Sequence, residues 1–191
     1  MTKAEIRKLY LQKRLTLSED EYEKLNKKIA DNFFDKLDLS HTKILHTFLP
    51  IEKTREPDTW DIINRILKKH PHIRIAIPRI NNQTSILEHF YYEDEKQLEK
   101  NTWGIPEPKQ GIPTPIDKID AVLVPLLAFD TQGHRIGYGR GFYDKFLNQC
   151  SPSIKKIGLS FFPPLEKIAD INPNDQLLTH VVTPEYVLTF D

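Results

Sequence analysis

The sequence has only one cysteine, Cys150, among its 191 residues. This excludes an internal disulfide and any zinc site built from cysteines. Such sparse use of cysteine suits a reducing compartment, and we expect a cytoplasmic protein. No apolar run reaches 18 residues, and the N-terminus is charged and amphipathic. The sequence therefore predicts neither a membrane segment nor a secretory leader.

An excess of charge of either sign is also absent. Lys and Arg together number 27, as do Asp and Glu, so the formal net charge is zero. Proteins that attract nucleic acid through their overall field carry a basic surplus. We expect no nucleic-acid partner, and any anion site must arise from a local group of cations.

Several common catalytic motifs are missing. The sequence contains no H-E-x-x-H, C-x-x-C or G-x-S-x-G. The phosphate loop G-x-x-x-x-G-K-[ST] and the dinucleotide fingerprint G-x-G-x-x-G are absent as well. These absences argue against the best-known metalloprotease, thiol-redox, serine-hydrolase and nucleotide-binding arrangements.

Short apolar runs alternate with amphipathic segments along the chain. This alternation predicts an α/β fold with a substantially parallel sheet, in one domain over residues 1–191 that we expect to be monomeric. Helices are predicted over residues 2–14, from the Ser18 capping box to about residue 37, and over residues 141–148. A further helix is predicted to begin at Pro57, with a core face of Trp60, Ile63, Ile66 and Leu67. Strands are predicted over residues 43–49, 73–77, 85–92, 121–127, 154–160, 181–182 and 186–190.

Two proline-containing segments interrupt this pattern. Pro78 is expected to stop the second strand. Four prolines within residues 106–115 argue against strand ladders or helix there. An interdomain linker is one alternative for this stretch, but we favour an ordered loop that carries Trp103 into a site. Trp103 as a core anchor remains the other explanation.

Four of the seven glycines lie within residues 133–141, in the stretch G-H-R-I-G-Y-G-R-G-F-Y-D. Glycine permits positive φ and close backbone approach, so this density predicts a tightly bent loop. A buried strand precedes the loop, a helix follows it, and Arg135 and Arg140 lie within it. Backbone amides in such a loop, together with a helix N-terminus, can form an anion site. We interpret the loop as a phosphate cradle.

Alternatives remain for the charged residues. Asp144 follows the glycines and could hold Mg2+, or it could simply favour a helix N-terminus. Lys3, Arg7 and Arg14 share one side of the first helix, which could be a solvated basic face. The mixture of Arg, Gly and aromatic residues in the loop also occurs in RNA-binding tracts, although those are usually longer and repetitive.

The stretch L-L-A-F-D-T-Q-G-H-R-I-G-Y-G-R-G-F-Y-D-K-F-L resembles the signature of the 5-formyltetrahydrofolate cyclo-ligase family, also called methenyltetrahydrofolate synthetase. The similarity extends along most of the chain. Four outlying segments also match in order: K-A-E-I-R at residues 3–7, E-P-D-T at 56–59, I-P-R at 77–79 and W-G-I-P-E-P at 103–108.

The resemblance implies a single three-layer α/β/α domain with a largely parallel, mixed central sheet. It also implies a ligase that forms a C–N bond, converting 5-formyltetrahydrofolate and ATP to 5,10-methenyltetrahydrofolate, ADP and phosphate with Mg2+. Both nucleophiles belong to the substrates, so no catalytic protein nucleophile is expected. Positioning would fall to Arg135 and Arg140.

Carried over position by position, the resemblance implies two overlapping binding sets and one metal ligand. The ATP-binding residues would be Lys3, Arg7, Arg135, Ile136, Gly137, Tyr138, Gly139, Arg140, Gly141, Phe142 and Tyr143. The folate-binding residues would be Ile51, Glu56, Trp103, Tyr138, Gly139, Arg140, Gly141 and Phe142. Asp144 would bind Mg2+.

Two positions depart from the family pattern. Some members have a second metal-binding Asp four residues after the position of Asp175, where this chain has Thr179, so no second ligand is assigned. Arg140 stands where some relatives have Lys or Gly, which suggests an auxiliary phosphate contact. Because of Thr179 and the absence of a protein nucleophile, a non-catalytic folate or nucleotide binder on the same fold remains an alternative to the enzyme.

Overall fold

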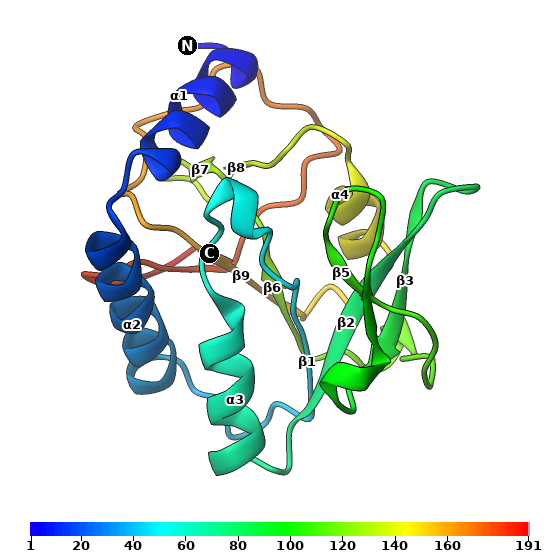
Figure 1. Cartoon of the computed structure of the whole chain (residues 1–191). Coiled ribbons are helices and arrows are strands. Elements are labelled where there is room, and N and C mark those ends of the chain that lie inside the picture. Colours follow the sequence, from blue (N-terminus) through cyan, green and yellow to red (C-terminus); the bar gives the residue numbers. More distant parts are fainter. Residues whose placement is uncertain (191) are drawn as a thin grey trace.

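A seven-stranded sheet runs through the centre of the protein in a computed structural model that describes residues 1–190 (Figure 1). The strand order is β11-β10-β9-β6-β1-β2-β3. The five inner strands pair in parallel, whereas the edge strands β3 and β11 pair antiparallel to their neighbours. The strands are β1 Ile44–His46, β2 Arg74–Asn81, β3 Ile86–Tyr91, β6 Ala121–Val124, β9 Lys155–Leu159, β10 His180–Val182 and β11 Val187–Thr189. The predicted mixed, mostly parallel α/β sheet is confirmed.

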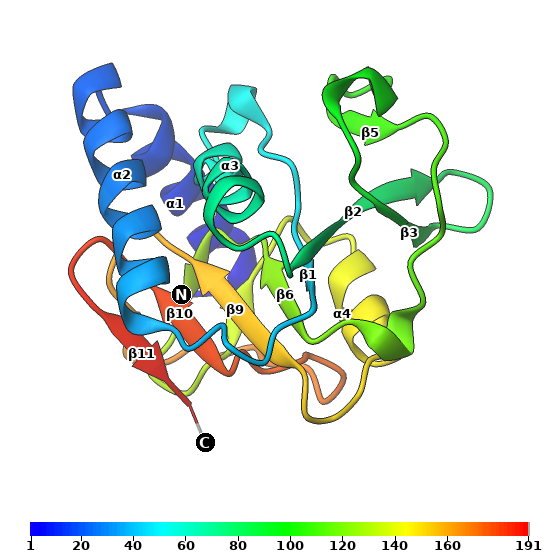
Figure 2. The same cartoon turned by 90° about the horizontal axis from the view of Figure 1, so that it is seen from below.

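Helices cover both faces of this sheet, which gives three layers (Figure 2). The helices are α1 Lys3–Leu15, α2 Glu19–Lys36, α3 Thr59–Lys69 and α4 Phe142–Leu147, with short 3-10 helices η1 Glu52–Thr54, η2 Glu95–Gln97 and η3 Ile116–Lys118. Helices α2 and α3 pack on one face, and α4 packs on the other. No helix within residues 1–190 has the length and apolar character needed to cross a membrane.

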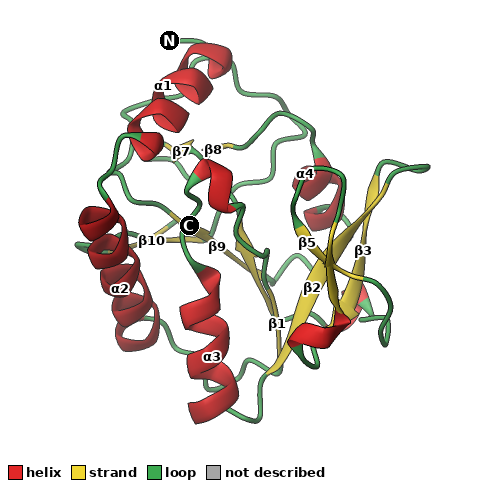
Figure 3. Cartoon of the chain, viewed as in Figure 1, coloured by secondary structure: helices red, strands yellow, loops and turns green. Residues whose placement is uncertain are grey.

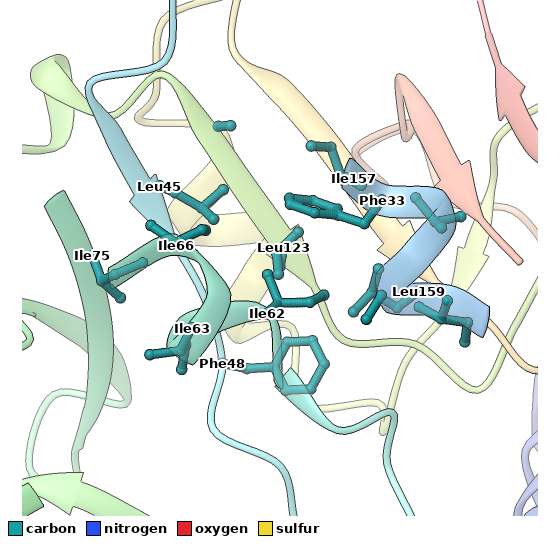
Figure 4. Packing of buried hydrophobic residues seen from close by; sticks show 14 of the residues in the cluster. Phe33, Leu45, Phe48, Ile62, Ile63, Ile66, Ile75, Leu123, Ile157 and Leu159 are labelled. Atoms are coloured by element: carbon teal, nitrogen blue, oxygen red, sulfur yellow. The ribbon is translucent and has the colours of Figure 1, made fainter. Parts of the chain in front are cut away.

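The larger core lies between the sheet and helices α2 and α3 (Figure 4). Phe33 of α2 and Ile62 of α3 meet Leu123 of β6 there, and all three side chains are fully buried. Burial of each such side chain contributes about 1.5–3 kcal/mol, so this cluster anchors both helices to the sheet. Helix α2 begins at the predicted capping box, in which Ser18 and Glu21 exchange hydrogen bonds.

The predicted start and core face of α3 are partly wrong. Asp58 caps the helix through the amide of Trp60, so Pro57 precedes the helix instead of starting it. The buried positions are Thr59, Ile62, Ile63 and Ile66. Leu67 is 47% exposed, because these four residues form the side of the helix that faces the sheet and Leu67 lies outside it.

Strand β2 also continues beyond its predicted end. Pro78 pairs with His89 of β3, and the hairpin extends to Asn81 and Ile86. Strand β1 accompanies β2 only as far as Ala76. Pro78 therefore lies where β2 has one sheet neighbour, which is a position that tolerates the missing amide donor.

A short strand begins the proline-rich stretch and pairs with another just before it, so the prediction of no strand ladder there is wrong. Strands β4 Leu98–Lys100 and β5 Pro106–Pro108 pair antiparallel, even though two of the three pairs include a proline. The amides of Asn101 and Lys109, which flank this ladder, donate the bonds that close it. Two more short strands, β7 Ala128–Phe129 and β8 Arg135–Ile136, bracket the turn before the glycine loop. Figure 3 shows long loops connecting these elements around the upper end of the sheet.

Candidate functional site

A cavity of about 460 Å³ lies beyond the carboxyl ends of β1 and β6. Phe48, Leu49 and Ile51 follow β1 into its wall, and Pro125 follows β6. Helix α1, η1, the β4–β5 hairpin and the glycine loop, defined as residues 137–141, form the other walls. Ligands of open α/β sheets bind at this edge, so the fold and the cavity point to the same place.

Nearly all residues that the sequence assigned to a site line this cavity. They are Lys3, Arg7, Ile51, Glu56, Trp103, Arg135, Gly137, Tyr138, Gly139, Arg140, Gly141, Phe142, Tyr143 and Asp144. Ile136 differs, because its side chain packs in a core cluster with Ile6 and Tyr10. The cavity also has lining residues that sequence reasoning missed: Phe48, Leu49, Lys53, Thr54, Pro78, Ile80, Leu87, Ile105, Pro106, Glu107, Pro125 and Asp175.

The glycine loop folds against α1. Gly139 has φ of +91°, and a Cβ there would lie 3.3 Å from Cζ of Arg7. Arg7 donates its Nε to the carbonyl of Gly137 at 2.9 Å. Gly141 has φ of +70° and caps α4. The close approach and the positive φ explain why glycine stands at these positions.

The basic side of α1 faces the protein. The Lys3 side chain is largely shielded, and Arg14 is only 2% exposed. The alternative of a solvated basic face is therefore wrong for these residues.

Two ion pairs mark one end of the cavity. Arg135 donates to Oδ1 of Asp144 at 2.8 Å, and Lys3 lies 2.5 Å from Oδ2 of Asp175. Burial acts to raise the pKa of Asp175, but hydrogen bonds from Lys3 and the amide of Asn172 outweigh it and leave this pKa lowered. With Arg7 beside them, three cations and two carboxylates gather here.

A metal would find few protein ligands at this end. Among residues 1–190, no group of three or more His, Cys, Asp or Glu residues is placed to hold an ion. Asp144 uses Oδ1 for Arg135 and for the amide of Gln176. Mg2+ commonly takes one or two carboxylates plus substrate phosphates, so a single carboxylate fits an ion delivered with a nucleotide. Thr179 hydrogen-bonds with Lys156 of β9 and does not line the cavity.

Another part of the cavity surrounds one buried carboxylate. Glu56 is 2% exposed and accepts a hydrogen bond from the amide of Ile51 at 2.7 Å. Tyr22 donates to the Glu56 carbonyl and so holds the loop from α2. Burial raises the pKa of Glu56, and Arg14 and the Tyr138 hydroxyl act against this. A carboxylate among apolar walls can accept paired N–H donors from a flat ring.

Two aromatic residues complete this part of the cavity. Trp103 lies at the tip of the β4–β5 hairpin, is 40% exposed, and stacks with Arg140, whose Cζ is 4.6 Å from the ring centroid. Trp103 is thus not a core anchor. Burial and the charge of Glu56 raise the pKa of Tyr143, whose hydroxyl has no hydrogen-bond partner within residues 1–190.

The chain resembles known proteins along its whole length. It is 31% identical over 162 residues to the 5-formyltetrahydrofolate cyclo-ligase of Mycoplasma pneumoniae, covering 84% of this chain and 86% of that one. It is 28% identical over 169 residues to the mitochondrial 5-formyltetrahydrofolate cyclo-ligase of Arabidopsis thaliana. That alignment covers 76% of this chain but only 61% of the Arabidopsis protein.

Solved structures agree with the sequence relatives. The 5,10-methenyltetrahydrofolate synthetase of Aquifex aeolicus superposes with a TM-score of 0.84 at 27% identity, covering 99% of this chain and 93% of that one. The synthetase of Mycoplasma pneumoniae gives a TM-score of 0.78 at 27% identity, covering 97% and 100%. The model of the 5-formyltetrahydrofolate cyclo-ligase family matches residues 1–184. The chain therefore belongs to the 5-formyltetrahydrofolate cyclo-ligase family.

Proposed function

We propose that this chain catalyses the ATP-dependent cyclisation of 5-formyltetrahydrofolate to 5,10-methenyltetrahydrofolate, with release of ADP and phosphate. The observation that carries the proposal is a single cavity lined by two chemically different groups of residues. Cations of α1 and β8 form one group, and the buried Glu56 with apolar residues forms the other. The glycine loop lines the same cavity, where the phosphate of one substrate would meet the formyl group of the other.

The reaction needs alignment more than it needs protein nucleophiles. The formyl oxygen attacks the γ-phosphorus of ATP and ADP leaves, which converts a poor leaving group into a phosphate ester on an N5-iminium carbon. N10 of the same folate then attacks that carbon, its proton is lost, and the C–O bond breaks to release phosphate. Lys3, Arg7 and Arg135 would bind the phosphates, while Arg140 would orient the transferred group.

Mg2+ would be held by Asp144 together with ATP oxygens. When bound, it neutralises charge on the phosphates. Arg135 would serve two neighbours, because one of its nitrogens already pairs with Asp144 and its side chain faces the cavity. The ion pair with Arg135 would hold the Asp144 carboxylate in place near the proposed phosphate-binding cations before either substrate binds.

The pterin ring would lie between the Glu56 carboxylate and the apolar wall that includes Ile51 and Trp103. The ring presents adjacent N–H donors, which an ionised carboxylate can accept together. Phe142 and the glycine loop would contact the folate near its formyl group. These assignments rest on the lining of the cavity and on the family signature.

The direct test is to incubate the protein with 5-formyltetrahydrofolate, ATP and Mg2+ and to follow methenyl absorbance. We expect an absorbance gain that depends on both substrates. Tight folate binding in calorimetry without any turnover would favour the non-catalytic binder. Salt-dependent binding of single-stranded RNA, with no folate binding, would favour the RNA-binding alternative.

We also propose that the chain works as a cytoplasmic monomer in one domain. The single cysteine, which is half-buried, and the one continuous central sheet support this proposal. Sedimentation of the purified protein checks the monomer, and a mass near twice 22.4 kDa would contradict it.

A further inference from the structure

Arg14 is a buried cation to which the proposed function gives no role. It lies near the end of α1 and is 2% exposed. One nitrogen donates to the carbonyl of Leu126 at 3.3 Å, and another donates to the hydroxyl of Tyr138 at 2.5 Å. Its Nε has no hydrogen-bond partner within residues 1–190.

The surroundings of Arg14 leave its charge without a direct counterion. Both acceptors are neutral, and none of the ion pairs within residues 1–190 includes Arg14. Removing a guanidinium from water is costly unless an opposite charge compensates it. Glu56 is equally buried and lines the same cavity as Tyr138, which Arg14 contacts. Glu56 is therefore the buried carboxylate whose charge can compensate Arg14.

The groups around Glu56 support this pairing. Burial raises the pKa of Glu56, and three neighbours act against this rise: the amide of Ile51, the charge of Arg14 and the hydroxyl of Tyr138. Tyr22 of α2 and Tyr143 of α4 also face this region, and both are neutral at pH 7 because burial raises the pKa of each further above its ordinary value. The charged neighbours of Tyr22 besides Arg14 are Arg55 and Asp58. Thr54 of η1 also contacts the Tyr138 hydroxyl, at 3.2 Å.

We propose that Arg14 is a positioning residue of the folate site. Together with the Tyr138 hydroxyl, it favours the ionised form of Glu56, and through its hydrogen bond to Tyr138 it holds the glycine loop in the wall of the cavity. An ionised Glu56 accepts the paired donors of a pterin, whereas a protonated one would place a donor against them. This inference rests on the proposed function, since it assigns the pterin to Glu56.

The test compares variants that remove the charge, keep it, or remove the bridge: Arg14→Met, Arg14→Lys and Tyr138→Phe. For Arg14→Met, we expect the KM for 5-formyltetrahydrofolate to rise at pH 7 because the ionised fraction of Glu56 falls, by at most about tenfold for each unit by which the pKa of Glu56 rises. The rise should diminish toward pH 9, and the KM for ATP should change much less. Arg14→Lys should restore most of the loss, and Tyr138→Phe should give a smaller loss with the same pH dependence.

A purely structural role for Arg14 would give a different pattern. Equal increases in both KM values, with no dependence on pH, would overturn the proposal. In the Glu56→Gln background, Arg14→Met should cause no further pH dependence, and a persisting pH effect would also overturn it. If Arg14→Met does not fold by circular dichroism, Arg14→Lys and Tyr138→Phe decide the question by the same pH profiles.

Calorimetry separates this inference from the proposed function. An inactive wild type would refute the cyclisation but would still allow titration with 5-formyltetrahydrofolate. We then expect Arg14→Met to raise the Kd at pH 7 and less at pH 9, by at most about tenfold for each unit by which the pKa of Glu56 rises. Unchanged affinity at both pH values would overturn the role of Arg14 by itself.

Discussion

Replacing Asp144 by Asn separates two roles of this side chain. In the structure, Oδ1 accepts hydrogen bonds from Arg135 at 2.8 Å and from the amide of Gln176 at 3.1 Å. Asn keeps the shape and one acceptor oxygen but removes the negative charge. The Arg135 side chain is only 6% exposed, so the loss of its ionic partner should cost about 1–2 kcal/mol of unfolding free energy. For a chain of this length, that lowers Tm by about 3–6 °C.

The same substitution tests the metal. If Asp144 contributes a ligand to Mg2+, the Mg2+ concentration that gives half-maximal cyclisation should rise at least tenfold in the variant, about 1.4 kcal/mol of binding free energy. The assay is a Mg2+ titration of methenyl formation at saturating folate and ATP, with thermal unfolding measured alongside. Asp117→Asn is the matched control, because Asp117 is an exposed carboxylate in η3. We expect it to change neither quantity.

The two measurements can fail separately. A lowered Tm with an unchanged Mg2+ dependence would show that Asp144 only partners Arg135, and would refute the metal assignment. An unchanged Tm would refute the energy assigned to the ion pair, whatever the Mg2+ result.

Three further predictions concern the loop, the cavity mouth and the core. Gly139→Ala should raise the KM for ATP at least tenfold, because alanine is strained at φ of +91° and its Cβ would crowd the Arg7 guanidinium. Steady-state kinetics measure this, and a KM for ATP equal to that of the wild type would contradict it. Trp103→Ala should raise the KM for 5-formyltetrahydrofolate about tenfold and leave Tm nearly unchanged, since the partly exposed ring contacts Arg140 at the cavity. A large drop in Tm would instead indicate that Trp103 belongs to the core. Burial lowers the pKa of His89 to about 4. Between pH 6.5 and 4 the unfolded chain therefore binds more protons than the folded protein, and the free energy of unfolding decreases as the pH is lowered. Urea unfolding should show a loss of about 2 kcal/mol from this group between pH 7 and 5, and His89→Phe should remove it; an unchanged acid sensitivity would count against this.

Local rules predicted much of the fold. The Ser18 capping box starts α2 where the sequence placed it, because both of its hydrogen bonds lie within four residues. The apolar run at residues 121–127 contains the fully buried strand β6 at the centre of the sheet. Such features depend on neighbours in the chain, and the sequence displays those neighbours.

Features that depend on distant partners were not predictable in this way. Pro78 was predicted to end its strand. However, β1 ends before it reaches Pro78, so no neighbouring strand requires a hydrogen bond from the Pro78 nitrogen. In the sequence, Asp175 served only to locate Thr179, where some relatives have a metal-binding Asp. In the structure, Asp175 itself lines the cavity and pairs with Lys3, which is far away in the sequence. The glycine loop was recognisable because its three glycines and Arg140 lie within five residues, with Arg135 just before them. Asp175 carried no comparable local signal.

Arg14 illustrates how a site can depend on residues that touch no reacting atom. The sequence places it with Lys3 and Arg7 on one side of a helix, but the fold buries it behind Tyr138. A reaction whose nucleophiles come from the substrates leaves the protein with alignment and charge as its means of catalysis. Buried charges then carry functional weight, because each fixes the protonation state of a group that binds substrate. An unpaired buried guanidinium would be a costly defect in a purely structural position, and the role that we propose for it toward Glu56 accounts for its burial.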